Sequence, residues 1–131
     1  MATIFSKIAS GEIPSHKILE DDRFFCFLDI NPLAKGHALV IPKKEVDYIF
    51  DMDDVDYRDM FLFAKKIAKA IKKCIKCEKV GIAVVGLEVL HAHIHLVPLN
   101  SIYDIDFSKP RVKLGEDEFR MIAKRISENI E

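Results

Sequence analysis

Short apolar stretches separated by polar turns dominate the first third of the chain. Residues 18–20 and 24–29 predict two strands joined by a polar turn. Residues 37–41 predict a third strand that ends at Pro42, because proline cannot donate to a sheet ladder. A short helical turn is predicted over residues 4–9. Three strands are therefore expected before the first long helix.

Further along the chain, the spacing of apolar residues becomes that of amphipathic helices. Over residues 53–76, apolar side chains recur every three or four positions, with aspartates at the start and lysines after them. That charge order complements a helix dipole. A final helix is predicted from one apolar stripe, which consists of Phe119, Ile122, Ala123, Ile126 and Ile130. Two more strands, residues 79–85 and 89–97, indicate an α+β fold with a five-stranded antiparallel sheet, one long helix and one C-terminal helix.

Three of the five histidines in the chain, His91, His93 and His95, occupy alternate positions in the last predicted strand. Because successive side chains of a strand point to opposite faces, the three imidazoles are predicted to share one face, with apolar side chains on the other. A lone histidine in a strand is usually a half-buried residue with a local hydrogen bond. A row facing an apolar core would leave several nitrogens without partners, at about 1–3 kcal/mol each. The row therefore indicates a functional site.

Composition narrows the possible functions. The 131 residues include 20 Lys+Arg and 21 Asp+Glu, and this balance argues against a general nucleic-acid binder. No apolar run approaches the ~20 residues that span a bilayer, and the first residues do not resemble a secretory signal, so we expect a cytoplasmic protein without a membrane partner. Three cysteines are too few for a disulfide framework. No linker or repeat divides the chain, which predicts a single domain over residues 1–131.

Two chemistries use histidines arranged in this way. In a metal site, neutral imidazoles coordinate zinc, copper or iron, and an open position activates water. In phosphoryl or nucleotidyl transfer, one neutral imidazole is the nucleophile, and the others orient it or donate hydrogen bonds to phosphate oxygens. The spacing of the three histidines allows both chemistries.

Residues 91–97 resemble the histidine triad (HIT) motif, in which three histidines alternate with apolar residues. The likeness extends to residues 4–8, 11–14, 20–32 and 36–44, which are similar to blocks of the small nucleotide-binding members of that superfamily. The resemblance implies a HIT-like fold and a homodimer whose two sheets join into one. It also implies hydrolysis of a purine nucleoside phosphoramidate, or of a related substrate such as a dinucleoside polyphosphate. The reaction would occur at the α-phosphate through a covalent nucleotidyl-histidine, without a cofactor.

The resemblance also implies roles for four histidines. His93, the middle residue of the motif, would be the nucleophile, with Nε2 facing phosphorus if its Nδ1–H is bound to a backbone carbonyl. His95 would donate to an α-phosphate oxygen and help the leaving group depart. His91 would act in orientation, and His37 would complete the cluster from the neighbouring strand. No metal is required by this scheme, because imidazoles and backbone amides can stabilise the developing charge.

The nucleoside side of the site follows from the same resemblance. Asp29 matches the acid that hydrogen-bonds the ribose hydroxyls, since a carboxylate can accept from two neighbouring hydroxyls. An apolar slot that holds a flat base is expected from five residues, Ile4, Phe5, Ile8, Phe27 and Ile30.

The chain departs from the family pattern at several positions. Gly86 matches, but Leu87 stands where glutamine is usual and Glu88 where a small residue often contacts the phosphate. We include Gly86 and Glu88 among the nucleotide-binding candidates, although a carboxylate beside a phosphate repels it unless it is turned away or paired. Thr3 and Ser6 stand where some relatives carry cysteines for a structural zinc, so no zinc is predicted there.

The main hypothesis is therefore a histidine triad nucleotide hydrolase. The first alternative is a nucleotide-binding module with little turnover, because its phosphate loop is altered. The second is a three-histidine metal-binding protein. Residues 100–114 bear little resemblance to the family, and substrate choice is hypothesised to lie in that segment.

Overall fold

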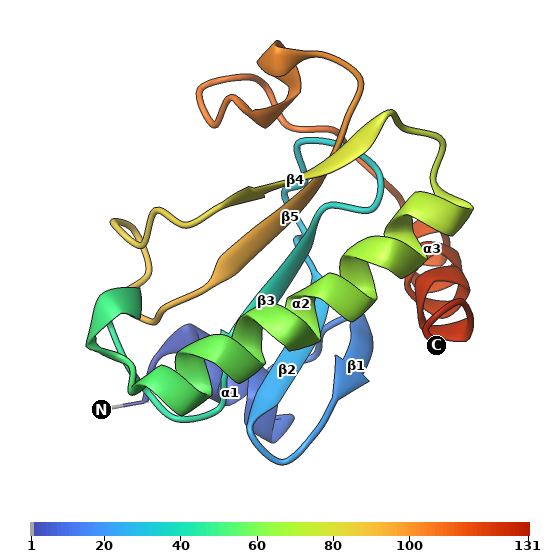
Figure 1. Cartoon of the computed structure of the whole chain (residues 1–131). Helices are drawn as coiled ribbons and strands as arrows, with labels where there is room; N and C mark the ends of the chain where they lie inside the picture. The colour runs from blue at the N-terminus through green and yellow to red at the C-terminus, as the bar shows by residue number, and fades with distance from the viewer. Residues whose placement is uncertain (1) are drawn as a thin grey trace.

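The computed structural model describes residues 2–131, which form one five-stranded sheet and the helices that pack on it (Figure 1). The strand order is β1-β2-β3-β5-β4, and every neighbouring pair is antiparallel. The strands are β1 (Lys17–Glu20), β2 (Phe24–Leu28), β3 (Ala38–Pro42), β4 (Lys79–Ala83) and β5 (Ile94–Leu99). The predicted α+β class with an antiparallel sheet is confirmed.

The two long helices cover the same face of the sheet. These are α2 (Asp54–Cys74), which contacts β3, β4 and β5, and α3 (Glu116–Glu128), which contacts β1 and β2 (Figure 1). The other elements are the short helix α1 (Ile4–Ser10) and two 3-10 turns, η1 (Ile49–Asp51) and η2 (Ile102–Ile105). The side chain of Asp53 caps α2 by accepting from the backbone N–H of Asp56, so this helix begins one residue later than predicted. None of the helices within residues 2–131 is long and apolar enough to cross a membrane.

Alternation along the strands divides the buried side chains between two clusters. Every second residue of β2 belongs to the larger core between the sheet and the helices α2 and α3. Phe25 and Phe27 belong to a smaller cluster on the opposite face, where α1 contributes Phe5 and Ile8. The two clusters therefore lie on opposite faces of the sheet.

The histidine segment keeps the predicted alternation. Ala92, Ile94 and Leu96 lie in the larger core, as expected for the apolar side of the motif. His95 pairs directly with Leu39 of β3, a residue of the smaller cluster, so its side chain emerges on the face that carries α1.

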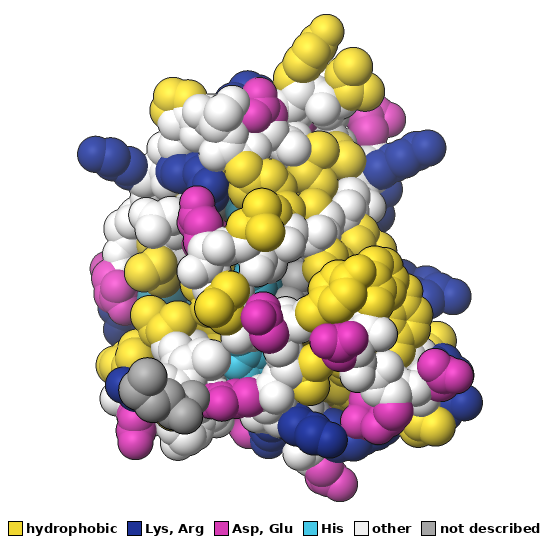
Figure 2. All heavy atoms as spheres, turned by 90° about the vertical axis from the view of Figure 1, so that its left-hand side faces the viewer, with side chains coloured by type: hydrophobic (Ala, Val, Ile, Leu, Met, Phe, Trp, Pro, Cys, Tyr) yellow, Lys and Arg dark blue, Asp and Glu magenta, His cyan; other side chains and the backbone are white. Residues whose placement is uncertain are grey.

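The predicted boundaries of the last two strands are wrong. β4 ends at residue 83 instead of 85, and β5 begins at residue 94 instead of 89, so His91 and His93 precede the strand. The backbone N–H of Ala92 donates to the carbonyl of Val46, at 2.6 Å, beyond the end of β3. This bond holds the backbone outside the ladder. Figure 2 views the end of the molecule that presents η1 and the loop 84–90, where parts of histidine side chains are visible between hydrophobic ones.

A glycine turn delivers the fourth histidine to the same face. Gly36 has φ of 92°, in the left-handed region that glycine adopts freely, and a Cβ there would lie 3.0 Å from the side chain of Ile75. His37 follows immediately, and its carbonyl accepts from the backbone N–H of Asp29 at 3.0 Å. The turn therefore places His37 and Asp29 beside each other, where β2 ends and β3 begins.

Candidate active site

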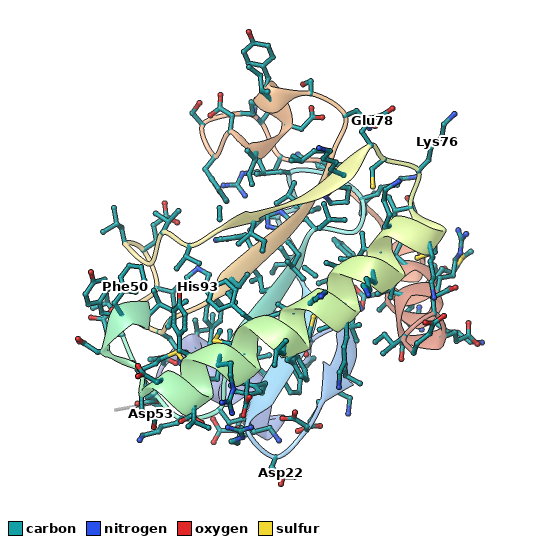
Figure 3. All side chains as sticks on the ribbon, in the orientation of Figure 1. Asp22, Phe50, Asp53, Lys76, Glu78 and His93 are labelled. Carbon is teal, nitrogen blue, oxygen red and sulfur yellow. The ribbon has the colours of Figure 1, made fainter. Side chains whose placement is uncertain are left out.

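Among the described residues, one ring nitrogen of His93 is hydrogen-bonded and the other has no hydrogen-bond partner. Its Nδ1 lies 2.7 Å from the backbone carbonyl oxygen of His91. Because a carbonyl can only accept, Nδ1 carries the proton and Nε2 holds the lone pair. Burial lowers the pKa of His93, which keeps the imidazole neutral at physiological pH. The side chain of His93 lies just before β5. It is at the same end of the sheet as η1, which contains Phe50 (Figure 3).

His95 has the opposite proton arrangement. The backbone N–H of Leu33 donates to Nδ1 of His37 at 2.9 Å, so the proton of the neutral His37 ring is on Nε2. That Nε2 lies 3.0 Å from Nδ1 of His95 and donates to it, which leaves the proton of His95 on Nε2. His95 therefore presents an N–H donor where His93 presents a lone pair, with the two ring centroids 4.9 Å apart.

Burial keeps both members of this pair neutral. Burial, together with a smaller effect of positive charge on neighbouring groups that include Arg111, lowers the pKa of His37 to about 4 and that of His95 to about 3. The two side chains are 0% and 8% exposed. The neutral forms are the ones that the chain of hydrogen bonds requires.

The pH dependence of stability is expected to follow from these two histidines. Since each pKa in the folded protein lies below the ordinary value of 6.5, the unfolded chain binds more protons between about pH 6.5 and 4. The free energy of unfolding should therefore be largest above pH 6.5 and fall as the pH decreases toward 4. Urea unfolding at intervals from pH 7.5 to 4.5 measures this. An unfolding free energy that stays constant over the range would contradict the assignment, and a His37→Gln variant should show a weaker dependence.

His91 is held at both ring nitrogens. Its Nε2 donates to the carbonyl oxygen of Pro42 at 2.7 Å, and the hydroxyl of Thr3 lies 2.6 Å from Nδ1. The ring is 0% exposed. His91 can therefore orient its neighbours, but it has no free nitrogen for a ligand.

These bonds bear on the metal-binding alternative. With both nitrogens of His91 occupied, the three motif histidines do not offer three free ligand atoms to one ion. Within the described residues, the group with suitable spacing is instead Asp29, His37 and His95, whose ligand atoms lie within 4.8 Å of one another. The ligand atom of His37 would be Nε2, which carries the proton, because its Nδ1 accepts from a backbone N–H. A protonated nitrogen has no lone pair for a metal ion. With this hydrogen bonding, Asp29, His37 and His95 therefore cannot all act as metal ligands.

Asp29 lies next to the histidine pair. Its Oδ1 accepts from the backbone N–H of Asn31 at 2.8 Å, and its Oδ2 lies 3.6 Å from Nε2 of His37. Burial raises the pKa of Asp29, while the N–H of Asn31 and the charge of Arg111 oppose the rise. The structure thus brings Asp29 to the histidines, as the assigned ribose contact requires.

Three of the predicted base-pocket residues lie together beside His93. The ring of Phe5 meets that of His93 edge to face, with centroids 4.9 Å apart, and meets that of Phe27 at 5.7 Å. Ile8 belongs to the same cluster. All three side chains are also largely buried, so they belong to the apolar core of this face, and their contact with a base stays a prediction.

The remaining nucleotide-binding candidates lie on the surface. Ile4 is 50% exposed and Ile30 is 66% exposed. Gly86 adopts φ of 72° in the loop 84–90, and Glu88 of the same loop is exposed. Gly86 and Leu87 line an apolar hollow of about 430 Å³ with η1 and α2, and neither Gly86 nor Glu88 makes a hydrogen bond to a histidine among residues 2–131. A nucleotide contact from these four residues therefore stays a prediction.

Two side chains of the site were missed from the sequence. Phe107 packs its ring against His95, with centroids 4.7 Å apart, and Arg111 lies over the Phe107 ring at 5.5 Å. Arg111 also donates to the carbonyl of Asn31 at 2.8 Å, which ties the segment after η2 across the histidines. Both residues lie in the segment with little family resemblance, so no motif indicated them.

Comparison with known proteins identifies the family. The model of the HIT domain matches residues 10–102. An uncharacterised HIT-like protein of Borreliella burgdorferi is 36% identical over 97% of both chains, and a Schizosaccharomyces pombe protein named adenosine 5′-monophosphoramidase is 33% identical over 99% of both. A crystal structure of a HIT-like protein from Bartonella henselae superposes with a TM-score of 0.83 at 30% identity, covering 98% of this chain and 96% of that one. The chain belongs to the HIT family, and the resemblance of the motif is confirmed.

Proposed function

We propose that the chain is a purine nucleotide hydrolase that acts at an α-phosphate through a covalent intermediate on His93. The observation that carries the proposal is the pair of complementary nitrogens, a lone pair on Nε2 of His93 and a proton on Nε2 of His95. A lone-pair nitrogen can attack phosphorus, and an N–H beside it can stabilise the charge that develops on the phosphate oxygens. The relative named adenosine 5′-monophosphoramidase supports the same substrate class.

The reaction proceeds in two displacements. Nε2 of His93 bonds to phosphorus while the phosphorus–nitrogen bond of the phosphoramidate breaks, and the amino group takes a proton from solvent and leaves as ammonia. Water then attacks the nucleotidyl-histidine, releases the nucleoside monophosphate and returns the proton. His95 donates its Nε2–H to a phosphate oxygen in both steps, which also eases departure of the leaving group. The net change is hydrolysis, with no redox partner and no metal.

The nucleoside is held by the residues on either side of the histidines. The carboxylate of Asp29 accepts from the ribose hydroxyls, and the Phe5–Phe27 cluster provides an apolar wall for the base. For Ile4, Ile30, Gly86 and Glu88, a nucleotide contact stays a prediction.

The direct test is turnover of adenosine 5′-phosphoramidate in the presence of a chelator. Release of AMP and ammonia is expected, since no step uses a metal, and chromatography measures the AMP. Binding without turnover would favour the nucleotide-binding module. Activity that disappears in chelator and returns with a divalent ion would favour the metal-binding protein.

We also propose that the chain is a homodimer joined through the free edge of β4. Among the described residues, β4 pairs with a neighbouring strand on one side alone, and the side chain of its Ile82 is 54% exposed. Nearby, the surface around η1 and the loop 84–90 exposes further apolar side chains, among them Phe50 at 67% and Leu87 at 83% (Figure 2). A second copy of the same edge would cover both features and extend the sheet.

Light scattering on the purified protein is expected to give the mass of two chains. The variant Ile82→Lys should shift the protein toward one chain, because it places a charge in the proposed contact. Met121→Lys is the matched control, since Met121 is 63% exposed on α3 and should leave the dimer intact. A parent that is monomeric at micromolar concentration contradicts the proposal.

A cytoplasmic location stays a prediction, consistent with three cysteines that are all free thiols.

A further inference from the structure

The first turn of α1 is bonded to the first histidine of the motif. Thr3 is the N-cap of this helix, and its hydroxyl oxygen accepts from the backbone N–H of Ser6 at 3.0 Å. The same oxygen lies 2.6 Å from Nδ1 of His91, a residue 88 positions away in the sequence. One hydroxyl therefore serves both the helix and the histidine segment.

The direction of this hydrogen bond is determined by the other partner of His91. Nε2 of His91 contacts the carbonyl oxygen of Pro42, which can only accept, so Nε2 carries the proton. Nδ1 then holds the lone pair, and the hydroxyl of Thr3 must donate to it. The tautomer of His91 is thereby held by two groups from different parts of the chain.

Glu45 holds Thr3 in turn. Its Oε1 accepts from the backbone N–H of Thr3 at 2.9 Å and from the hydroxyl of Ser6. Both bonds lower the pKa of Glu45 and keep its carboxylate charged, and the bond from the Ser6 hydroxyl has the larger effect. Ser6 donates its own proton to Glu45, so its Oγ, 3.2 Å from the Thr3 hydroxyl oxygen, can accept as well. Of the two acceptors within reach of the Thr3 proton, Nδ1 of His91 is the nearer, at 2.6 Å.

We propose that Thr3 and Glu45 are positioning residues that act on His93 through His91. This inference rests on the function proposed above. The backbone carbonyl of His91 is the acceptor that determines the tautomer of His93, so a His91 ring pinned at both nitrogens holds that carbonyl in place. Phe5, in the turn capped by Thr3, packs on the rings of both His91 and His93, with centroids 5.9 and 4.9 Å apart. The cap therefore connects helix α1 to the nucleophile by two routes.

Three substitutions at Thr3 separate its roles. Thr3→Val removes both the cap and the donor. Thr3→Asp keeps a good cap acceptor but has no proton to donate at neutral pH. Thr3→Ser retains both functions. We expect kcat to fall about tenfold in the Val and Asp variants with KM changed less than twofold, and to recover in the Ser variant, because the defect is one of orientation rather than of substrate contact.

Two further variants serve as controls. Asp53→Ala removes the cap of α2, and kcat should stay at the parent value because that cap contacts no histidine of the site. Glu45→Gln keeps an acceptor oxygen and should stay close to the parent, whereas Glu45→Leu should behave like Thr3→Val.

Nitrogen-15 chemical shifts of the His91 ring provide a readout that does not depend on activity. In the parent, Nδ1 should show the shift of an unprotonated nitrogen that accepts a hydrogen bond, and in Thr3→Val this shift should move toward that of a free lone pair. If the parent turns over substrate but the Val and Asp variants retain its kcat or its His91 shifts, the positioning role is overturned while the proposed function stands. If the parent has no turnover, the proposed function fails, and the positioning role fails with it.

Discussion

Replacing His93 with alanine is expected to abolish turnover of adenosine 5′-phosphoramidate, with a loss of kcat of about 10⁴-fold or more. Nε2 of His93 is the free nitrogen with a lone pair that the hydrogen bonds of the cluster leave for phosphorus. The other motif histidines cannot replace it, because His91 is bound at both nitrogens and His95 carries its proton on Nε2. Intact-mass measurement after rapid quenching should find a nucleotidyl adduct that never forms in His93→Ala.

The variant His95→Ala makes this test sharper. Without the Nε2–H donor, formation and hydrolysis of the intermediate should both slow, so release of AMP should fall, while an adduct on His93 can still form. His16→Gln is the control, since His16 stacks on Phe119 of α3, away from the cluster, with centroids 5.0 Å apart. Its turnover should stay near that of the parent. An adduct or undiminished hydrolysis in His93→Ala would refute the assignment of the nucleophile.

The second large effect is expected at His37, which does not belong to the motif. His37→Leu removes the donor to Nδ1 of His95, so the proton of His95 is no longer directed to Nε2, where the phosphate needs it. It also leaves the partly buried N–H of Leu33 without its acceptor, which destabilises the turn after Asp29. We expect kcat to fall about 100-fold, in the range found when one donor to developing charge is lost.

His37→Gln provides the comparison for that result. The terminal amide of glutamine can place an N–H near the position of the histidine Nε2 and donate to His95. Turnover in the Gln variant should therefore be at least several-fold higher than in the Leu variant, with both measured at pH 7.5. An equal loss of kcat in the two variants would indicate that turnover does not depend on the hydrogen bond donated to His95. His37 would then contribute through the packing of its side chain alone. Retention of full activity in His37→Leu would contradict the hydrogen-bond chain itself.

The fold was largely predictable from the sequence because alternation and helical period are local properties. Proline and polar turns marked the ends of β2 and β3, and the apolar stripes marked α2 and α3. The alternation of histidines with Ala92, Ile94 and Leu96 predicted which side of the segment faces the core, and that prediction is confirmed. The start of β5 was not predictable in this way, because a hydrogen bond from Ala92 to distant Val46 holds the preceding residues outside the ladder.

The sequence by itself determined the family, since the histidines, their spacing and the blocks around them are sufficient to recognise the HIT family, and it predicted which residues carry the chemistry. Only the tertiary structure decided what each nitrogen does. A tautomer depends on the partner of the second nitrogen, and those partners come from Thr3, Leu33 and Pro42, far from the motif along the chain. Phe107 and Arg111 reach the site for the same reason, because the segment after η2 folds back over His95 through contacts that no local pattern encodes.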